Sequence, residues 1–255
     1  MPQPQTQALV AAVVLALVHL HSGRMRFLGH APRSAWLSAF AGISVAYVFV
    51  HLLPELAEGQ AALDGANRGE GGGEQGSPLL AFLEDHVYVM ALVGLLVFYG
   101  VERHSLASRR DQYARSGEDC TAQDAFWLSI ASFAVYNAIV GYLLLRGELG
   151  ELPALALYTV ALAVHFVVND FGLREHHKGA YTRIGRWIIA AAVLIGWLLG
   201  ITTDIPQRVI ALVIAFIAGG VILNVLKEEL PTERRAPLMP FLAGAILYTV
   251  LLQVA

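Results

Sequence analysis

The sequence has few of the residues that equip a water-soluble protein. Of its 255 residues, 15% are charged and 56% are hydrophobic, whereas about 25% of the residues in a soluble domain are charged. Its single cysteine, Cys120, excludes an intramolecular disulfide framework and any metal site built from several cysteines. Lysine occurs only at Lys178 and Lys227, and no basic tract indicates a nucleic acid partner. The shortage of charge argues against a soluble enzyme.

What the sequence does have is long apolar runs, separated by glycine, proline and charged clusters. A membrane helix needs about 20 residues, so eight spans would use about 160 of them and leave about 95 for ends and loops. That remainder is too small for a separate soluble domain. We therefore predict an all-α polytopic membrane protein, with residues 1–255 forming a single transmembrane domain in a lipid bilayer. The predicted spans are 7–22, 36–57, 81–104, 124–146, 153–174, 184–203, 207–229 and 237–254.

The basic residues predict how these spans are oriented. Alternate loops hold 14 of the 17 Lys and Arg residues, and the opposite side holds Arg68, Arg146 and Arg208. Basic loops stay in the cytoplasm, so this bias predicts that both termini lie outside it. The preference for Arg over Lys, with much Ala and Gly, is typical of a GC-rich bacterial gene, so we expect the bacterial inner membrane. The loop at about 58–80 lies on the outer side, is rich in Gly and Glu, and is predicted to be unstructured.

Polar residues within spans face a bundle interior or a pathway, because they are costly in lipid. In span 36–57, His51 and Glu55 lie four residues apart on one helix face, and Pro54 is expected to bend the helix. They are candidates for the entrance of a pathway, and the alternative is that they snorkel to the interface. Polar residues also mark spans 124–146, 153–174 and 207–229. These spans and 36–57 are predicted to form an inner bundle, with apolar spans outside it.

Span 153–174 is the richest in such residues. It contains His165, Asn169 and Asp170, and a buried Asp near a buried His needs a partner, a metal ion or a proton. Imidazole and carboxylate groups together suit Zn²⁺. These two groups therefore predict a metal site at His165 and Asp170, while Asn137 of span 124–146 fits a pathway and an interhelical hydrogen bond equally. At the predicted cytoplasmic boundary, His176 and His177 are candidates for an exit, and the alternative is a solvated pair.

Two stretches resemble motifs of the ZIP family of divalent metal transporters. They are His51-Leu-Leu-Pro-Glu55 in the second span and the segment from Ala218 to Pro231 in the seventh. The resemblance covers nearly the whole chain. It implies eight spans, both termini outside, an inner bundle of the second, fourth, fifth and seventh spans, and transport of a divalent metal ion such as zinc.

The chain departs from the family pattern in the two spans that hold the family's metal site. The fourth-span motif His-Asn-x-Pro-Glu-Gly is matched by Tyr136-Asn-Ala-Ile-Val-Gly141. The fifth-span motif His-Glu-x-Pro-His-Glu-x-Gly is matched by His165-Phe-Val-Val-Asn-Asp-Phe-Gly172. Carboxylates that bridge metals in the family are therefore replaced by Val140 and Phe166, which cannot bind a metal. The resemblance leaves His165, Asp170, Asn137 and Asn169 as the predicted metal ligands, and these suit one ion at most.

Two functions stay open on these grounds. The first is a ZIP-like transporter of divalent cations, zinc above all, with an altered binding site. The alternative is a non-transporting homologue that senses metal or protons or serves as a partner subunit. An enzyme is not expected, because the chain lacks a Gly-x-Ser-x-Gly or His-Glu-x-x-His motif and a Gly-rich phosphate loop. The sequence does not fix the oligomeric state, and a homodimer stays open.

Overall fold

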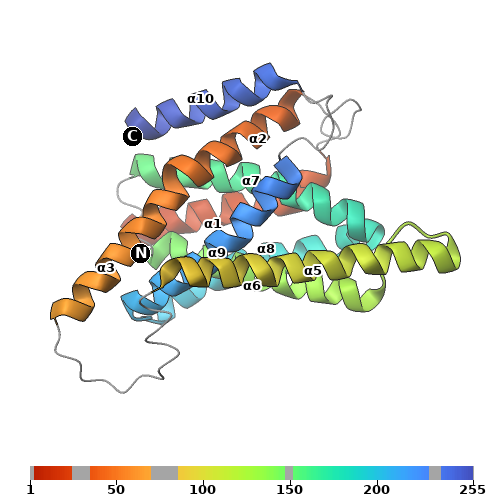
Figure 1. The fold of residues 1–255 in the computed structure, drawn as a ribbon, viewed down its shortest axis with the longest axis horizontal. Coiled ribbons are helices and arrows are strands. Elements are labelled where there is room, and N and C mark those ends of the chain that lie inside the picture. Colours follow the sequence, from red (N-terminus) through yellow and green to blue (C-terminus); the bar gives the residue numbers. More distant parts are fainter. Residues whose placement is uncertain (1–2, 25–34, 70–85, 147–151, 230–236, 255) are drawn as a thin grey trace.

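The computed structural model describes residues 3–24, 35–69, 86–146, 152–229 and 237–254, and every regular element in these ranges is helical (Figure 1). The helices begin and end within a few residues of most of the predicted spans, because long apolar runs have few alternatives to a helix. They are α1 (Gln3–His21), α2 (Ala35–Tyr47), α3 (Leu53–Gly69), α5 (Val87–Ser116), α6 (Gln123–Arg146), α7 (Leu152–Ala180), α8 (Arg186–Thr202), α9 (Gln207–Asn224) and α10 (Leu238–Val254). A 3-10 turn, η1 (Ser22–Arg24), follows α1, and the π-helical turns are η3 (Val48–Leu52), η4 (Tyr181–Gly185) and η5 (Val225–Glu229).

Six helical segments of the described chain are long and apolar enough to cross a membrane. One of them, Leu152–Thr202, has 51 residues and includes α7, η4 and α8. As one straight helix it would be about 75 Å long, against about 30 Å for the hydrocarbon layer. The backbone leaves helical geometry at Lys178 (φ 46°, ψ −121°), and α8 runs back beside the bundle from that point (Figure 1). The shorter apolar helix Leu238–Gln253 is additional to the six.

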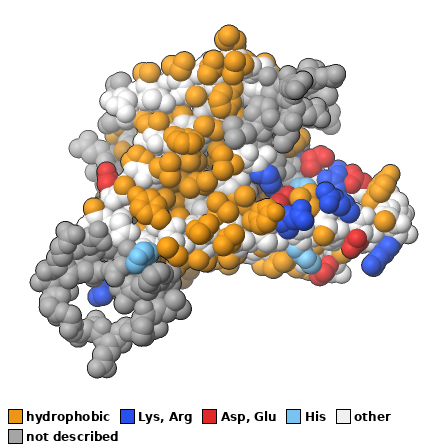
Figure 2. Space-filling view, in the orientation of Figure 1, with side chains coloured by type: hydrophobic (Ala, Val, Ile, Leu, Met, Phe, Trp, Pro, Cys, Tyr) orange, Lys and Arg blue, Asp and Glu red, His pale blue; other side chains and the backbone are white. Residues whose placement is uncertain are grey.

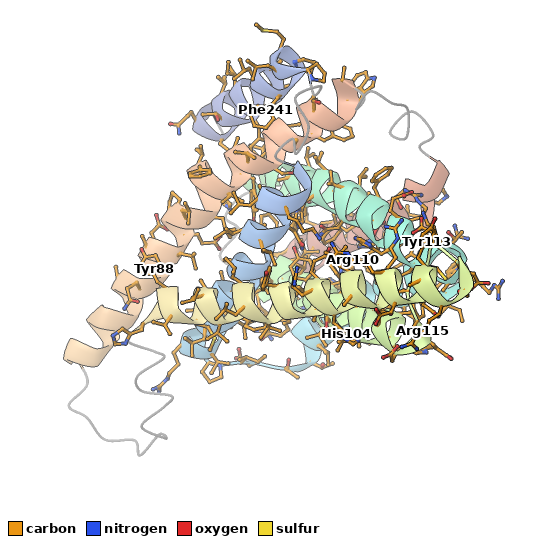
Figure 3. The ribbon with its side chains drawn as sticks, turned by 45° about the vertical axis from the view of Figure 1, so that its right-hand side comes forward. Tyr88, His104, Arg110, Tyr113, Arg115 and Phe241 are labelled. Carbon is orange, nitrogen blue, oxygen red and sulfur yellow. The ribbon has the colours of Figure 1, made fainter. Side chains whose placement is uncertain are left out.

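Successive helices alternate in direction, so the turns gather at two ends of the molecule (Figure 1). One end contains η1, the turn between α5 and α6, η4 and η5, and we call it the basic end. Arg110 and Arg115 lie there on α5, far from Tyr88 at the start of that helix (Figure 3). Charged side chains gather at this end, while hydrophobic side chains cover the middle of the visible face (Figure 2). The start of α1 and the end of α10 both lie at the opposite end.

The part of the chain after Pro54 differs from the sequence-based expectation. The segment 58–80 was predicted to be unstructured, but α3 continues to Gly69, where Ala61, Ala62 and Leu63 favour a helix. Residues 70–80 lie outside the described ranges. Proline cannot donate a backbone hydrogen bond, and the π-helical turn η3 immediately before α3 accommodates that loss.

Glycines allow three pairs of helices to pack backbone against backbone, namely α6 with α8, α5 with α9 and α2 with α10. A Cβ atom on Gly196 of α8 would lie 1.8 Å from the carbonyl oxygen of Ala138, and one on Gly141 of α6 would lie 2.0 Å from that of Val193. Small residues at such interfaces are the usual means of close helix approach in membranes. The other two pairs have the same reciprocal arrangement, with Gly94 and Gly219 in one and Gly42 and Gly244 in the other.

The first helix packs against α7 and α8, and also reaches α6. Its buried face is made mostly of alanine, including Ala8, Ala11 and Ala12, so the neighbouring helices come close. Near its basic end this face carries His19, which is 2% exposed. The first span was expected to belong to the apolar outer helices. The buried His19 differs from that expectation. The inner bundle of the second, fourth, fifth and seventh spans stays a prediction.

Candidate functional site

The most deeply buried polar group of the described chain joins three helices. His19 of α1 lies between Asp170 of α7 and Asn137 of α6, and these three side chains are 2%, 0% and 1% exposed. The distance from His19 Nδ1 to Asp170 Oδ1 is 2.9 Å, and that from His19 Nε2 to Asn137 Oδ1 is also 2.9 Å. The imidazole stacks on the ring of Phe166, with 4.6 Å between the ring centres. Both ring nitrogens of His19 are thus paired with buried oxygen atoms, as burial away from water favours.

The orientation of the Asn137 amide fixes one proton on His19. Asn137 Nδ2 donates a hydrogen bond to the carbonyl oxygen of Phe133 at 2.8 Å, so Oδ1 faces the imidazole and can only accept. Nε2–H of His19 is therefore the donor in that contact. The contact between Nδ1 and Asp170 Oδ1 then holds a second proton, either on an imidazolium that donates or on a carboxyl group that donates. In both forms the pair is neutral overall, which suits its burial.

The second oxygen of Asp170 differs from the first. Oδ2 is buried without a hydrogen-bond partner among the described residues, and the same holds for the Tyr181 hydroxyl of η4. Asp170 therefore has one acceptor that is fully used and one that is not.

The predicted metal ligands lie in two separate hydrogen-bonded groups. Asp170 and Asn137 bind His19, while Asn169 Nδ2 lies 3.0 Å from His165 Nε2 on the same helix. His165 and Asp170 are five residues apart, so they point to sides of α7 about 140° apart. No group of three or more His, Cys, Asp and Glu residues that could hold a metal occurs in the described ranges. A single site formed by all four residues stays a prediction, and it requires His19 to move.

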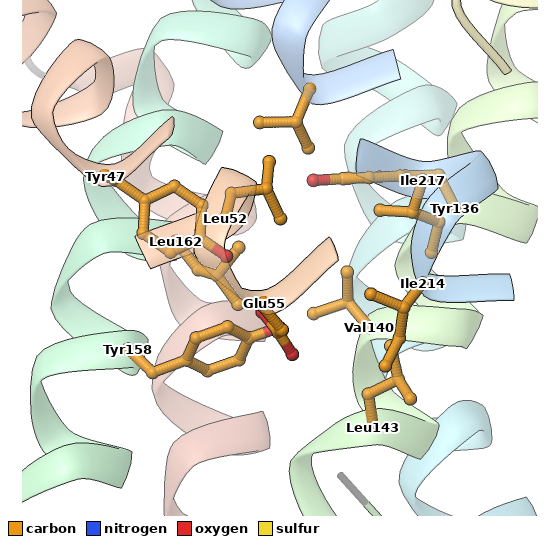
Figure 4. A pocket seen from close by; sticks show the side chains of 11 residues that line it. Tyr47, Leu52, Glu55, Tyr136, Val140, Leu143, Tyr158, Leu162, Ile214 and Ile217 are labelled. Carbon is orange, nitrogen blue, oxygen red and sulfur yellow. The ribbon is translucent and has the colours of Figure 1, made fainter. Parts of the chain in front are cut away.

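Two pockets lie within the bundle, and the described lining of each includes one carboxylate. The first, the Glu55 pocket, encloses about 30 Å³, room for about one water molecule. Glu55 and the rings of Tyr47 and Tyr158 lie on one side of it and Tyr136 on the other (Figure 4). His51, on the preceding π-helical turn, has its Nε2 atom 3.8 Å from Glu55 Oε2, and both side chains are about one-third exposed, at 35% and 34%. The two candidate entrance residues are therefore adjacent.

The second, the Glu102 pocket, is on the side of the basic end and encloses about 20 Å³. Glu102 of α5 is the sole carboxylate among the described residues that line it. Its Oε2 atom lies 2.8 Å from Nζ of Lys227 on η5, and its Oε1 atom lies 3.5 Å from Nε2 of His176. The other described polar residues of the lining are Ser105, Ser129, Asn169, His177 and Asn224. Four helices and a π-helical turn thus converge on one ion pair.

Aromatic rings separate the two pockets. Tyr136 lines the Glu55 pocket, whereas Phe98 and Phe133 line the Glu102 pocket. The centre of the Phe98 ring lies 6.1 Å from that of Tyr136 and 5.9 Å from that of Phe133, both in edge-to-face contact. Gly220 of α9 makes room for this cluster, because a Cβ atom there would lie 2.6 Å from Phe98 Cδ2. We call Phe98, Phe133 and Tyr136 the aromatic barrier.

The two histidines of the predicted exit have different surroundings. His176 contacts Glu102, whereas Nδ1 of His177 lies 2.5 Å from the hydroxyl of Thr121 in the turn between α5 and α6. The Arg109 guanidinium of α5 donates to Asp119 in the same turn, and this hydrogen bond lowers the pKa of the Asp119 carboxyl below its ordinary value. Both contacts attach the turn to the helices around the Glu102 pocket. The exit role of the histidines stays a prediction.

Sequence reasoning missed His19, Glu102 and Lys227 as members of the polar interior. Each lies within about one turn of a span end, where a polar residue ordinarily reads as interfacial. A usable signal for His19 was its position on the same face as Ala8, Ala12 and Ala16, since those small residues mark a packed face. Comparison of the sequence with protein-family models, with curated proteins and with solved structures returns no match.

Proposed function

We propose that this chain is a ZIP-like membrane carrier of a divalent metal cation, with an altered binding site and zinc as the expected cargo. The observation that supports this best is the pair of pockets, each with a single carboxylate, on opposite sides of the aromatic barrier. A carrier exposes its cargo site to one side of the membrane at a time. Two pockets separated by packed rings are the arrangement that such alternation needs.

The proposal includes eight membrane passes in a bacterial inner membrane, with both termini outside the cytoplasm. The reversal at Lys178 divides the 51-residue apolar run into two passes, and α10 supplies a further one. The clustering of Arg and Lys at the basic end favours its placement in the cytoplasm. In that orientation the Glu55 pocket is on the outer side and the Glu102 pocket is on the inner side.

The carboxylates favour a cation as cargo. Glu55 is the only charged residue that lines its pocket among the described residues, so the pocket attracts positive charge. His51 beside it offers a nitrogen ligand of the kind that zinc accepts. Passage from there to the basic end requires the aromatic barrier to open.

A second candidate function is a ZIP-like protein that does not transport and instead senses metal or protons or serves a partner protein. It is favoured by His19, which already uses Asp170 Oδ1 and Asn137 Oδ1. Where a deletion phenotype is fully rescued by both Asp170→Ala and His165→Ala, the carrier interpretation fails and this one remains.

The direct test is uptake of Zn²⁺ into liposomes that contain the purified protein and an internal zinc-sensitive dye. We expect uptake above that of empty liposomes, and a rate about tenfold lower for Glu55→Gln, because the pocket loses its only charge. The matched control is Glu175→Gln, since Glu175 is 52% exposed and pairs with Lys178 outside both pockets. Absence of uptake of Zn²⁺, Mn²⁺ and Fe²⁺ by folded protein would contradict the carrier proposal and favour the second candidate.

A further inference from the structure

Lys227 occupies an unusual place for a lysine in a cation pathway. Its ammonium lies 2.8 Å from Glu102 Oε2, in a pocket whose other described polar lining residues are two serines, two asparagines and two histidines, namely Ser105, Ser129, Asn169, Asn224, His176 and His177. Glu102 is 19% exposed and Lys227 is 29% exposed, so bulk water reaches the pair only in part. Lys227 is also one of only two lysines in the chain.

The lining of this pocket, apart from Lys227, is suited to a cation. It offers one carboxylate, two imidazoles, two side-chain amides and two hydroxyls, which include the oxygen and nitrogen ligands that divalent metal ions accept. The free space of about 20 Å³ is also large enough for a dehydrated ion with at most one water molecule. With the ammonium in place, however, the charge of Glu102, the one carboxylate among the described lining residues, is offset, and an arriving dication meets a positive charge.

The backbone at this point has the features of a movable attachment. Lys227 lies on the π-helical turn η5, directly after α9 ends at Asn224. Single π-helical turns occur frequently at functional sites. The lysine side chain is long and flexible, so its ammonium can leave Glu102 without a change of fold.

We propose that the Lys227 ammonium occupies the position beside Glu102 that a divalent ion would take, so that the ion binds in this pocket only when the ammonium moves away. This inference rests on the proposed carrier function and adds a regulatory element to it. The empty pocket stays neutral and closed to small cations. Cargo and ammonium then exclude each other at the same carboxylate.

The test measures Zn²⁺ binding by calorimetry to the full chain in detergent micelles, without any transport. We expect Lys227→Met to tighten the Kd about tenfold or more, because one positive charge is removed beside the carboxylate. Lys227→Arg keeps the charge and should bind like the unaltered protein. The matched control is Lys178→Met, which removes the chain's other lysine at a site outside the pocket, 39% exposed. The double variant Lys227→Met with Glu102→Gln should lose the gain.

The proposal is overturned where folded Lys227→Met and Lys178→Met bind Zn²⁺ with the same Kd, or where the gain survives in the double variant. Size-exclusion elution and helical content establish folding, and Lys227→Gln replaces Lys227→Met where the methionine variant does not fold. Failure of the carrier function gives a different result. In that case no liposome takes up Zn²⁺, while the gain in Kd on removal of Lys227 still reports on the pocket.

Discussion

His19 makes hydrogen bonds to side chains of two other helices, and for this reason a single residue near the end of α1 affects three elements. Asp170 and Asn137 are buried at the point where α1, α6 and α7 meet. Among the described residues, His19 is the hydrogen-bond partner of Asp170 Oδ1 and Asn137 Oδ1. In lipid, water cannot replace a lost partner. The cluster therefore holds α1, α6 and α7 together.

Replacement of His19 by alanine should consequently destabilise the protein strongly. It leaves a buried carboxyl group and a buried amide oxygen without donors, and loss of one member of a buried pair costs about 3 kcal/mol or more. We expect a clear fall in the melting temperature in detergent, followed by intrinsic fluorescence. His21→Ala is the matched control, because His21 is on the same helix but exposed, with its ring hydrogen-bonded to the carbonyl oxygen of Leu17. Equal melting temperatures for the two variants would contradict the buried cluster.

The same residue shows what could and could not be predicted from the sequence. Helix positions depend on long apolar runs, so the predicted spans agree with the helices to within a few residues at most ends. A pairwise contact has no comparable signal. Asp170 was correctly expected to need a partner, but nothing in the sequence indicated that a histidine 151 residues away supplies it. Glu102 was missed for the same reason, since its partners Lys227 and His176 come from other elements.

At the scale of elements, three helix pairs of the bundle pack in the same way. In each pair a glycine on one helix faces the backbone of the other, and a second glycine faces back. Without a hydrophobic driving force between helices in lipid, such close packing supplies much of their association. π-helical turns interrupt the α-helical backbone. Two of them, η3 and η5, adjoin the Glu55 and Glu102 pockets.

Gly196→Ala should therefore separate α6 from α8. The new Cβ atom would lie 1.8 Å from the carbonyl oxygen of Ala138, so the backbones must move apart, and overpacking of this kind costs about 1–3 kcal/mol. We expect a lower melting temperature in detergent. Gly100→Ala on α5 is the control, since a Cβ atom there meets nothing within 4 Å and alanine favours the helix. A variant at Gly196 as stable as the one at Gly100 would show that these helices do not depend on close contact.

At the scale of the whole molecule, the end at which the turns gather is also the end at which the basic residues gather. Helices that alternate in direction bring the turn at Lys178, the turn between α5 and α6, and η5 to one end, which is also where Arg and Lys gather. These two features are independent, because one follows from the path of the backbone and the other from composition. Their coincidence is what a membrane protein with one cytoplasmic face requires.

The single cysteine of the chain allows this orientation to be measured without a fusion protein. Cys120 lies in the turn between α5 and α6 at the basic end, and its side chain is partly exposed. A maleimide that cannot cross membranes should leave Cys120 unlabelled in intact cells and label it after permeabilisation, because the proposed orientation places it in the cytoplasm.

A variant with Cys120→Ser and Asp204→Cys carries the thiol between α8 and α9, where the Asp204 side chain is 88% exposed. It should be labelled in intact cells. The reverse pattern would place the basic end outside and invert the roles of the Glu55 and Glu102 pockets, whereas labelling of both variants in intact cells would contradict an odd number of passes between the two turns.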